Sequence, residues 1–237
     1  MSRWLIVRHA ETPWNLEGKI QGHTDISLSE RGFQQAEALR TRLAACQINA
    51  AYASDLKRTM ETAQTVLKGR KLSPSPSPEL REFAYGRWEG MTHKEVEEAD
   101  PKLYSEMMKR SEDFAPPGGE SLLDLMVRVG GFVSRLKEAH SKDDTLLITG
   151  HGGSLRVLLT CLLSLPPSAA WSFLLDSASL SVVDCHPDNA VLRLLNDTSH
   201  YRSEFQATLP GRPVWWRPAE PSSSQPSSAQ GEREVRP

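Results

Sequence analysis

Residues 4–12 read Trp4-Leu5-Ile6-Val7-Arg8-His9-Ala10-Glu11-Thr12. The first four residues are apolar, and a short apolar run of this kind is typical of a buried β-strand. Because the run stops at an Arg-His pair, we expect the guanidinium of Arg8 and the imidazole of His9 to emerge at the carboxyl end of the strand. In open α/β sheets this is the edge at which ligands bind. The stretch therefore predicts a strand of an α/β sheet with a ligand site beside its end.

Three later segments carry groups that fit the same site. The first, Ser54-Asp55-Leu56-Lys57-Arg58-Thr59, follows the apolar stretch Ala50-Ala51-Tyr52-Ala53 and opens a helical pattern with Arg58 in its first turn. The second, Leu80-Arg81-Glu82-Phe83-Ala84-Tyr85-Gly86-Arg87-Trp88-Glu89-Gly90, carries the carboxylate of Glu82. The third, Leu146-Leu147-Ile148-Thr149-Gly150-His151-Gly152-Gly153-Ser154-Leu155-Arg156, is an apolar strand that ends at His151, after which glycines open a helix. Two histidines, two arginines and one carboxylate can thus converge on a pocket the size of a phosphate group.

The alternation of strands and helices predicts an α/β fold, a three-layer α/β/α sandwich with a mostly parallel central sheet. A polar loop is expected over 13–29, and Ser27 or Ser29 caps the helix that follows. The residues of that helix expected to face the sheet are Phe33, Ala36, Leu39 and Leu43. Further helices are expected over 121–140, 155–165 and 169–175, and closing strands over 179–185 and 191–196. The charged segment 92–110 is expected to form a helical lid or insertion near the pocket.

The composition changes sharply near residue 210. Residues 1–209 are expected to form one domain, whereas 210–237 are rich in proline, serine and charged residues and are expected to form a disordered tail. Trp215-Trp216 is the exception within the tail. This aromatic pair can fold back on the domain or contact a partner.

Charge and cysteine usage exclude several classes of function. A net charge of −2 over 237 residues lacks the basic excess of nucleic-acid-binding proteins, so no nucleic-acid partner is expected. The three cysteines, Cys46, Cys161 and Cys185, lie far apart and form no CxxC pair, which favours a reducing compartment. No apolar stretch is long enough to span a membrane, and no signal-peptide pattern precedes the first strand. We therefore expect a cytoplasmic protein without membrane contact.

With all of these motifs in the same order, the chain resembles the histidine phosphatase superfamily, in its phosphoglycerate mutase-like branch, from about Trp4 to Tyr201. The resemblance implies a phosphoric monoester hydrolase that acts on a small phosphorylated metabolite through a phosphohistidine, with no metal ion or other cofactor. It assigns His9 as the nucleophile and Arg8 and Arg58 as the clamp on the transferred group. His151 would donate a further hydrogen bond as an imidazolium, and Glu82 would act as acid and then as base.

The same resemblance implies a set of substrate contacts. Asn15 matches a position whose amide contacts phosphate, Gln21 and Gly22 match a loop over the substrate, and Tyr85 lies in a segment that lines it. Gly152 completes the set next to His151. The remaining histidines, including His23, are treated as structural.

Two alternatives concern the site itself. His9 and His151 can be taken as metal ligands, but neither has an acidic partner at ligand spacing, and Arg8 would oppose a metal ion. The site can also be a silent phosphate-binding pocket in an interaction protein, which Trp215-Trp216 alone favours. Resistance to chelators separates the first alternative from a metal-independent phosphatase.

The substrate is the most open part of the prediction. A cofactor-dependent phosphoglycerate mutase remains an alternative, because Lys94, Lys109 and Arg110 can hold a second anion. The segment 170–200 looks like that of α-ribazole phosphatases and metal-independent phosphoserine phosphatases. We take α-ribazole 5′-phosphate, an intermediate of cobalamin synthesis, as the first expectation, with phosphoserine or a sugar phosphate as alternatives. An exposed edge strand can also support a homodimer.

Overall fold

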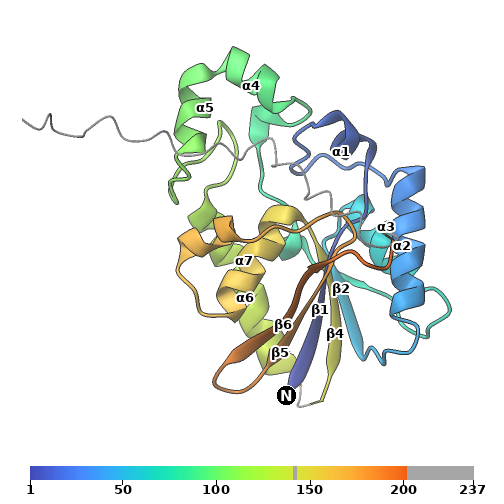
Figure 1. Cartoon of the computed structure of the whole chain (residues 1–237). Coiled ribbons are helices and arrows are strands. Elements are labelled where there is room, and N and C mark those ends of the chain that lie inside the picture. The colour runs from blue at the N-terminus through green and yellow to red at the C-terminus, as the bar shows by residue number, and fades with distance from the viewer. Residues whose placement is uncertain (141–142, 202–237) are drawn as a thin grey trace, which may run out of the picture. The chain divides into compact units, whose positions relative to one another are not determined.

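A six-stranded mixed sheet forms the centre of the computed structural model, which describes residues 1–140 and 143–201 (Figure 1). The strands are β1 (Ser2–Arg8), β2 (Ala50–Ala53), β3 (Ser75–Pro76), β4 (Thr145–Gly150), β5 (Leu180–Cys185) and β6 (Ala190–Asp197). Their order in the sheet is β3-β2-β4-β1-β5-β6. The first four strands in this order run parallel to one another, whereas β5 and β6 are antiparallel to their neighbours. The prediction of a mostly parallel sheet is confirmed.

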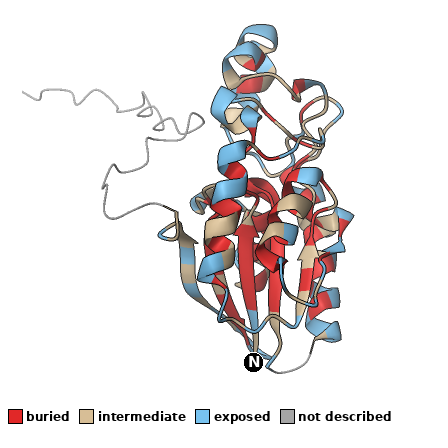
Figure 2. Cartoon of the chain, turned by 90° about the vertical axis from the view of Figure 1, so that its right-hand side faces the viewer, coloured by how far each residue is buried: buried red, intermediate tan, exposed pale blue. Residues whose placement is uncertain are grey.

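Helices cover both faces of this sheet. They are α2 (Glu30–Arg42) and α3 (Lys57–Leu67) on one face, and α6 (Leu122–Ala139) and α7 (Gly152–Leu162) on the other. Because side chains alternate along a strand, Leu5 and Val7 of β1 pack with α2 and α3, whereas Trp4 and Ile6 pack with α6 and α7. Figure 2 shows the buried layer along the strands between these helices. This is the predicted three-layer α/β/α sandwich.

A small helical cap, comprising α4 (His93–Ala99) and α5 (Pro101–Met108), corresponds to the predicted insertion over 92–110. In Figures 1 and 2 the cap lies beyond the end of the sheet that is opposite the N-terminus, the end toward which β1, β2 and β4 run. Its buried core consists of Ile20, Trp88, Val96 and Tyr104. The cap therefore stands at the edge of the sheet where the site is predicted.

The face of α2 differs from the prediction at one residue. As predicted, Ser29 caps the helix, its Oγ accepting a hydrogen bond from the backbone N of Gly32 at 3.0 Å. Phe33 does not face the sheet but is 43% exposed. A Cβ at Gly32 would lie 2.1 Å from the carbonyl oxygen of Glu11, so α2 packs tightly against Glu11 at Gly32, and Phe33, the next residue, lies to the side of this contact. The buried residues of α2 are Gly32, Gln35, Ala36 and Leu39.

Three other element boundaries also differ. The predicted polar loop contains α1 (Pro13–Glu17), which begins because Thr12 and Asn15 cap each other reciprocally and proline occupies the first turn. Helix α7 begins at Gly152 rather than at residue 155, and His151 is its N-cap residue. The expected helix over 169–175 is a 3₁₀ helix over Pro167–Ser172. Two shorter 3₁₀ turns, Pro78–Leu80 and Gly86–Trp88, flank the segment that carries Glu82.

The predictions for the C-terminal tail, including Trp215 and Trp216, fall outside the described residues. Among the helices of residues 1–140 and 143–201, none combines the length and the hydropathy that crossing a membrane would require.

Candidate active site

The two strand-terminal histidines lie side by side. β1 and β4 are parallel neighbours with Arg8 opposite Gly150, and the backbone N of His9 donates to the carbonyl of Gly150 at 2.9 Å. The ring centroids of His9 and His151 are 5.2 Å apart. Both side chains are buried, with exposed fractions of 3% and 0%. The prediction that the ends of these strands bring the histidines together holds in the structure.

His9 is held in one tautomer. Its Nδ1 donates to the carbonyl of Ala10 at 2.7 Å, so the proton lies on Nδ1 and the lone pair on Nε2. Burial holds the pKa of His9 well below its usual value, and the charges of Arg58 and Arg8 lower it further. The ring is therefore neutral, and Nε2 can act as a nucleophile.

Arg58 connects a loop to the second histidine. The residue is fully buried in the first turn of α3, and its Nη1 and Nη2 donate to the carbonyls of Thr24 and Gly22 at 2.8 and 2.7 Å. Its Nε donates to Nδ1 of His151 at 3.1 Å. A guanidinium carries five N–H groups, so two remain on the Nη atoms for a further acceptor.

This contact decides the form of His151. Because Nδ1 accepts from Arg58, the ring proton lies on Nε2. Burial holds the pKa of His151 well below its usual value, and the charge of Arg58 lowers it further. In this structure His151 is therefore a neutral ring that offers one N–H donor, and the imidazolium stays a prediction for the state in which a dianionic ligand is bound.

Two buried donors beside His9 have no acceptor among the described residues. They are Nε2 of His151 and Nε of Arg8. Arg8 is otherwise fixed by its Nη1, which donates to the carbonyl of Leu175 at 2.6 Å. Buried N–H groups are rarely left without a partner, and several of them around one point favour an acceptor with several oxygens.

The carboxylate of Glu82 lies at the N-terminus of α7. Oε1 and Oε2 accept from the backbone N of Gly153 at 2.9 and 3.0 Å, and Oε1 also accepts from the backbone N of Ser154 and Phe83 at 3.2 and 2.9 Å. A helix N-terminus presents unpaired amides and favours negative charge. A Cβ on Gly152 would lie 3.7 Å from both Arg8 Nε and Glu82 Oε2, so both groups lie close to Gly152. The carboxylate is thus brought to the strand-end cluster, as predicted.

The predicted substrate contacts Asn15, Gln21 and Tyr85 lie in helix α1, in the loop that follows it and in the segment after Glu82. Oδ1 of Asn15 accepts from the backbone N and the Oγ1 of Thr12, both at 3.0 Å, which leaves its amide nitrogen as a donor. Oε1 of Gln21 is buried and meets no donor within the described part of the chain. Tyr85 lies with its ring centroid 5.9 Å from that of Phe83, and burial raises the pKa of its phenol.

Three residues in the wall of the site were not predicted. Nε2 of His23 contacts the carbonyl of Glu82 at 2.9 Å, and Trp171 stacks on Phe83 at 6.2 Å with a 7° angle between the rings. The carboxylate of Glu89 accepts four hydrogen bonds, one of them from the backbone N of His23. The Glu82 carbonyl lies 59 residues from His23 in the chain, and the backbone N of His23 lies 66 residues from Glu89, so no local pattern signals these two contacts.

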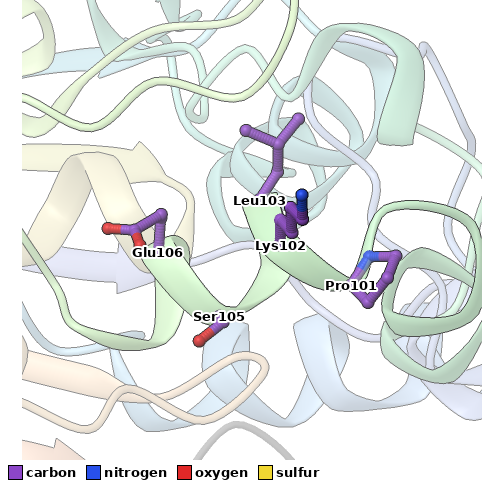
Figure 3. A pocket seen from close by; sticks show the side chains of 5 residues that line it. All are labelled: Pro101, Lys102, Leu103, Ser105 and Glu106. Atoms are coloured by element: carbon purple, nitrogen blue, oxygen red, sulfur yellow. The ribbon is translucent and has the colours of Figure 1, made fainter.

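Within residues 1–140 and 143–201, no three His, Cys, Asp or Glu side chains gather as a metal ion would require. The Nδ1 atoms of both histidines are engaged by hydrogen bonds, and the charges of Arg8 and Arg58 oppose a cation. A separate surface pocket on the cap is lined by Pro101, Lys102, Leu103, Ser105 and Glu106 of α5 (Figure 3). None of these residues belongs to the cluster around His9.

Comparison with known proteins gives consistent matches. The family described as histidine phosphatase superfamily (branch 1) matches residues 4–198. The adenosylcobalamin/α-ribazole phosphatase of Salmonella typhimurium is 34% identical over 204 residues, which cover 86% of this chain and 100% of the relative. Phosphoserine phosphatase 1 of Hydrogenobacter thermophilus is also 34% identical, over 84% of this chain and 94% of the relative. The crystal structure of the α-ribazole phosphatase from Shigella flexneri superposes with a TM-score of 0.78 at 33% identity, covering 83% of this chain and 96% of that one.

Proposed function

Since the chain belongs to the histidine phosphatase superfamily (branch 1) and is a phosphoric monoester hydrolase, we propose that His9 accepts the phosphoryl group from the substrate and passes it to water. One observation supports this role above the others. The neutral ring of His9 is fixed on the Ala10 carbonyl through Nδ1, which leaves the lone pair on Nε2; the ring of His151 lies 5.2 Å away, and the charges of Arg58 and Arg8 are near enough to lower the pKa of His9.

In the first step, Nε2 of His9 attacks phosphorus, so that a P–N bond forms as the P–O bond to the leaving group breaks. Nε of Arg8, the remaining N–H groups of Arg58 and Nε2–H of His151 donate to the non-bridging oxygens. The carboxyl group of Glu82 gives its proton to the departing alkoxide. This is the arrangement that a phosphomonoesterase needs: a nucleophile, a clamp and an acid.

In the second step, water attacks the phosphohistidine, and the Glu82 carboxylate accepts the proton that the water loses. The P–N bond breaks and inorganic phosphate leaves. The three amides that hold Glu82 keep its carboxyl group at one place through both steps. No metal ion or other cofactor takes part in either step of this proposal.

The first candidate for the substrate is α-ribazole 5′-phosphate. Its support is the similarity to relatives with this activity in their names and a set of contacting aromatic rings, Phe83, Tyr85 and Trp171, that suits an alcohol carrying an aromatic base. Phosphoserine is a second candidate, because a phosphoserine phosphatase is equally similar in identity. For a mutase, Lys94, Lys109 and Arg110 would have to hold a second anion, and the two lysines are exposed and paired with Glu98 and Glu106.

The test is a phosphatase screen in excess EDTA with α-ribazole 5′-phosphate, phosphoserine, 3-phosphoglycerate and common sugar phosphates. We expect phosphate release with kcat/KM far higher for one substrate than for the others, and an acid-labile phosphoryl group on His9 in quenched reactions. Loss of all turnover in EDTA would instead require a metal. Isomerisation of 3-phosphoglycerate without phosphate release would indicate a mutase, and inactivity in every assay would leave a binding role.

A further inference from the structure

One carboxylate fixes the loop that contains Gln21 and Gly22. We propose that Glu89 is a positioning residue of the phosphatase reaction, which holds loop 21–24 so that the carbonyls of this loop orient Arg58 against His151. The inference rests on the proposed function, because it is there that Arg58 is assigned to the phosphoryl group.

Four donors converge on the Glu89 carboxylate. Oε1 accepts from the backbone N of His23 at 2.9 Å and of Tyr85 at 3.2 Å. Oε2 accepts from the backbone N and the Oγ1 of Thr24 at 2.9 and 2.7 Å. Three of the four bonds come from loop 21–24, and bonds to an ionised acceptor are stronger than those between neutral groups. The carboxylate therefore ties this loop to the segment that follows Glu82.

Gly22 shows how closely the loop wraps this carboxylate. Its φ is +51°, in the left-handed region that favours glycine, and a Cβ there would lie 2.1 Å from Oε1 of Glu89. The absence of a side chain at Gly22 is thus required by the contact with Glu89. Gly22, a predicted substrate-binding residue, therefore packs directly against the carboxylate of Glu89.

The loop then sets the plane of the Arg58 guanidinium. The carbonyls of Gly22 and Thr24 accept from Nη2 and Nη1, and these two contacts aim Nε at Nδ1 of His151. The chain of contacts runs from Glu89 through the loop to Arg58, and from Arg58 to the tautomer of His151. A shift of the loop would therefore change both the clamp and the donor on the phosphoryl group.

The negative charge of Glu89 also favours the charged form of Arg58. Burial lowers the pKa of Arg58 to about 10, and the carboxylates of Glu82, Asp25 and Glu89 oppose this lowering. Glu89 thus supports the charged state of a guanidinium that it does not touch.

The chain just before loop 21–24 and the chain just after Glu89 are also joined by contacts that do not involve Glu89. The backbone N of Ile20 donates to the carbonyl of Met91 at 2.9 Å, and the backbone N of Gly90 donates to the carbonyl of Ile20 at 2.8 Å. Lys19 and Thr92 add an antiparallel bridge. Loss of the carboxylate should therefore loosen loop 21–24 while the surrounding fold persists.

The test is a double-mutant cycle of Glu89→Gln and Arg58→Ala, with the binding of inorganic phosphate measured by titration calorimetry. The amide of glutamine keeps the size of the side chain but replaces one acceptor oxygen with a donor that faces other donors. We expect Glu89→Gln to weaken phosphate binding by about tenfold in the otherwise unchanged chain. In the Arg58→Ala background the same change should alter binding by less than about twofold, because its effect passes through Arg58. Equal losses in both backgrounds, or no loss in either, would overturn the positioning role.

A second readout is the ¹⁵N NMR signal of the His151 ring, which does not require bound phosphate. Glu89→Gln should shift the Nδ1 resonance, because Arg58 Nε is no longer held against it, and an unchanged resonance would contradict the proposal. Glu95→Gln is the matched control, since Glu95 lies in the same part of the chain and its side chain accepts, among the described residues, only from Thr92 at the start of its own helix. It should leave both readouts unchanged.

A milder variant separates misfolding from mispositioning. Thr24→Val keeps Glu89 and the backbone bond but removes the hydroxyl bond, and we expect phosphate binding about threefold weaker while the unfolding temperature falls by only about 2–4 °C. The result for Arg58→Ala distinguishes the two proposals. If this variant binds phosphate as well as the unaltered chain, the proposed phosphate site itself fails. If it binds less well and Glu89→Gln does not, only the role of Glu89 fails.

Discussion

Gly153→Ala is the sharpest test of the position of Glu82. A Cβ on Gly153 would lie 2.3 Å from Oε1 of Glu82 and 2.4 Å from Cδ2 of Phe83, whereas ordinary contact begins at 3.4 Å. The carboxylate must therefore retreat by about 1 Å, and a misplacement of this size can cost about a hundredfold in rate. The retreat also breaks or lengthens the bonds from the amides of Gly153 and Ser154.

The expected result is a loss of about a hundredfold in kcat on an alkyl phosphate and a smaller loss on p-nitrophenyl phosphate, whose leaving group needs little protonation. Gly153 has no positive φ, so alanine introduces no backbone strain. The control is Gly131→Ala, because a Cβ at Gly131 in α6 meets nothing within 4 Å.

This control should keep kcat and raise the unfolding temperature by about 2–4 °C, since alanine exceeds glycine in helix propensity by about 1 kcal/mol. Both variants are assayed by steady-state kinetics and thermal unfolding. A Gly153→Ala protein that folds and keeps kcat within about twofold on the alkyl substrate would refute the placement of the acid.

Three further predictions concern the histidines and the acid itself. His9→Ala should abolish turnover while leaving the thermal unfolding midpoint nearly unchanged, because the only side-chain hydrogen bond that His9 makes among the described residues goes to its neighbour Ala10; retained turnover would eliminate the phosphohistidine. Glu82→Gln should reduce kcat far more on alkyl phosphates than on p-nitrophenyl phosphate, and equal losses would show that Glu82 is not the acid of the first step. Stability should fall as the pH drops below 6.5, because the unfolded chain then protonates His9 and His151, whose folded pKa values are well below this. The free energy of unfolding from urea titrations between pH 5 and 8 checks this. The slope should become smaller, but not zero, in the His9→Ala/His151→Ala variant, because burial also lowers the pKa values of His93 and His200; an unchanged slope would contradict the assignment.

Much of the site could be predicted because it is encoded at strand ends. Arg8, His9 and His151 follow apolar runs directly, and parallel strands bring their carboxyl ends to one edge, so local pattern and sheet topology suffice. Arg58 follows by the same logic, in the first turn of the helix after β2.

What could not be predicted depends on contacts between distant segments. The neutral form of His151 follows from the Nε of Arg58, which lies 93 residues away in the chain, and the sequence alone suggested an imidazolium. The hydrogen bond from the backbone N of Gly153, at the N-terminus of α7, to the carboxylate of Glu82 likewise joins residues 71 positions apart. Phe33 was misplaced because the approach of α2 is set by Gly32 against Glu11, a contact that helical spacing does not contain.

The separate core of the cap affects how this protein can evolve. The buried residues under α4 and α5 belong to neither of the two clusters that line the sheet, so substitutions there leave the strands that hold the histidines unperturbed. Tyr85 packs against both the cap core and the main core, so a substitution at this position affects both. Selection can thus alter Val96 and Tyr104 for a new leaving group, whereas Ile20 and Trp88 adjoin Gln21 and Glu89 and stay linked to the position of Arg58.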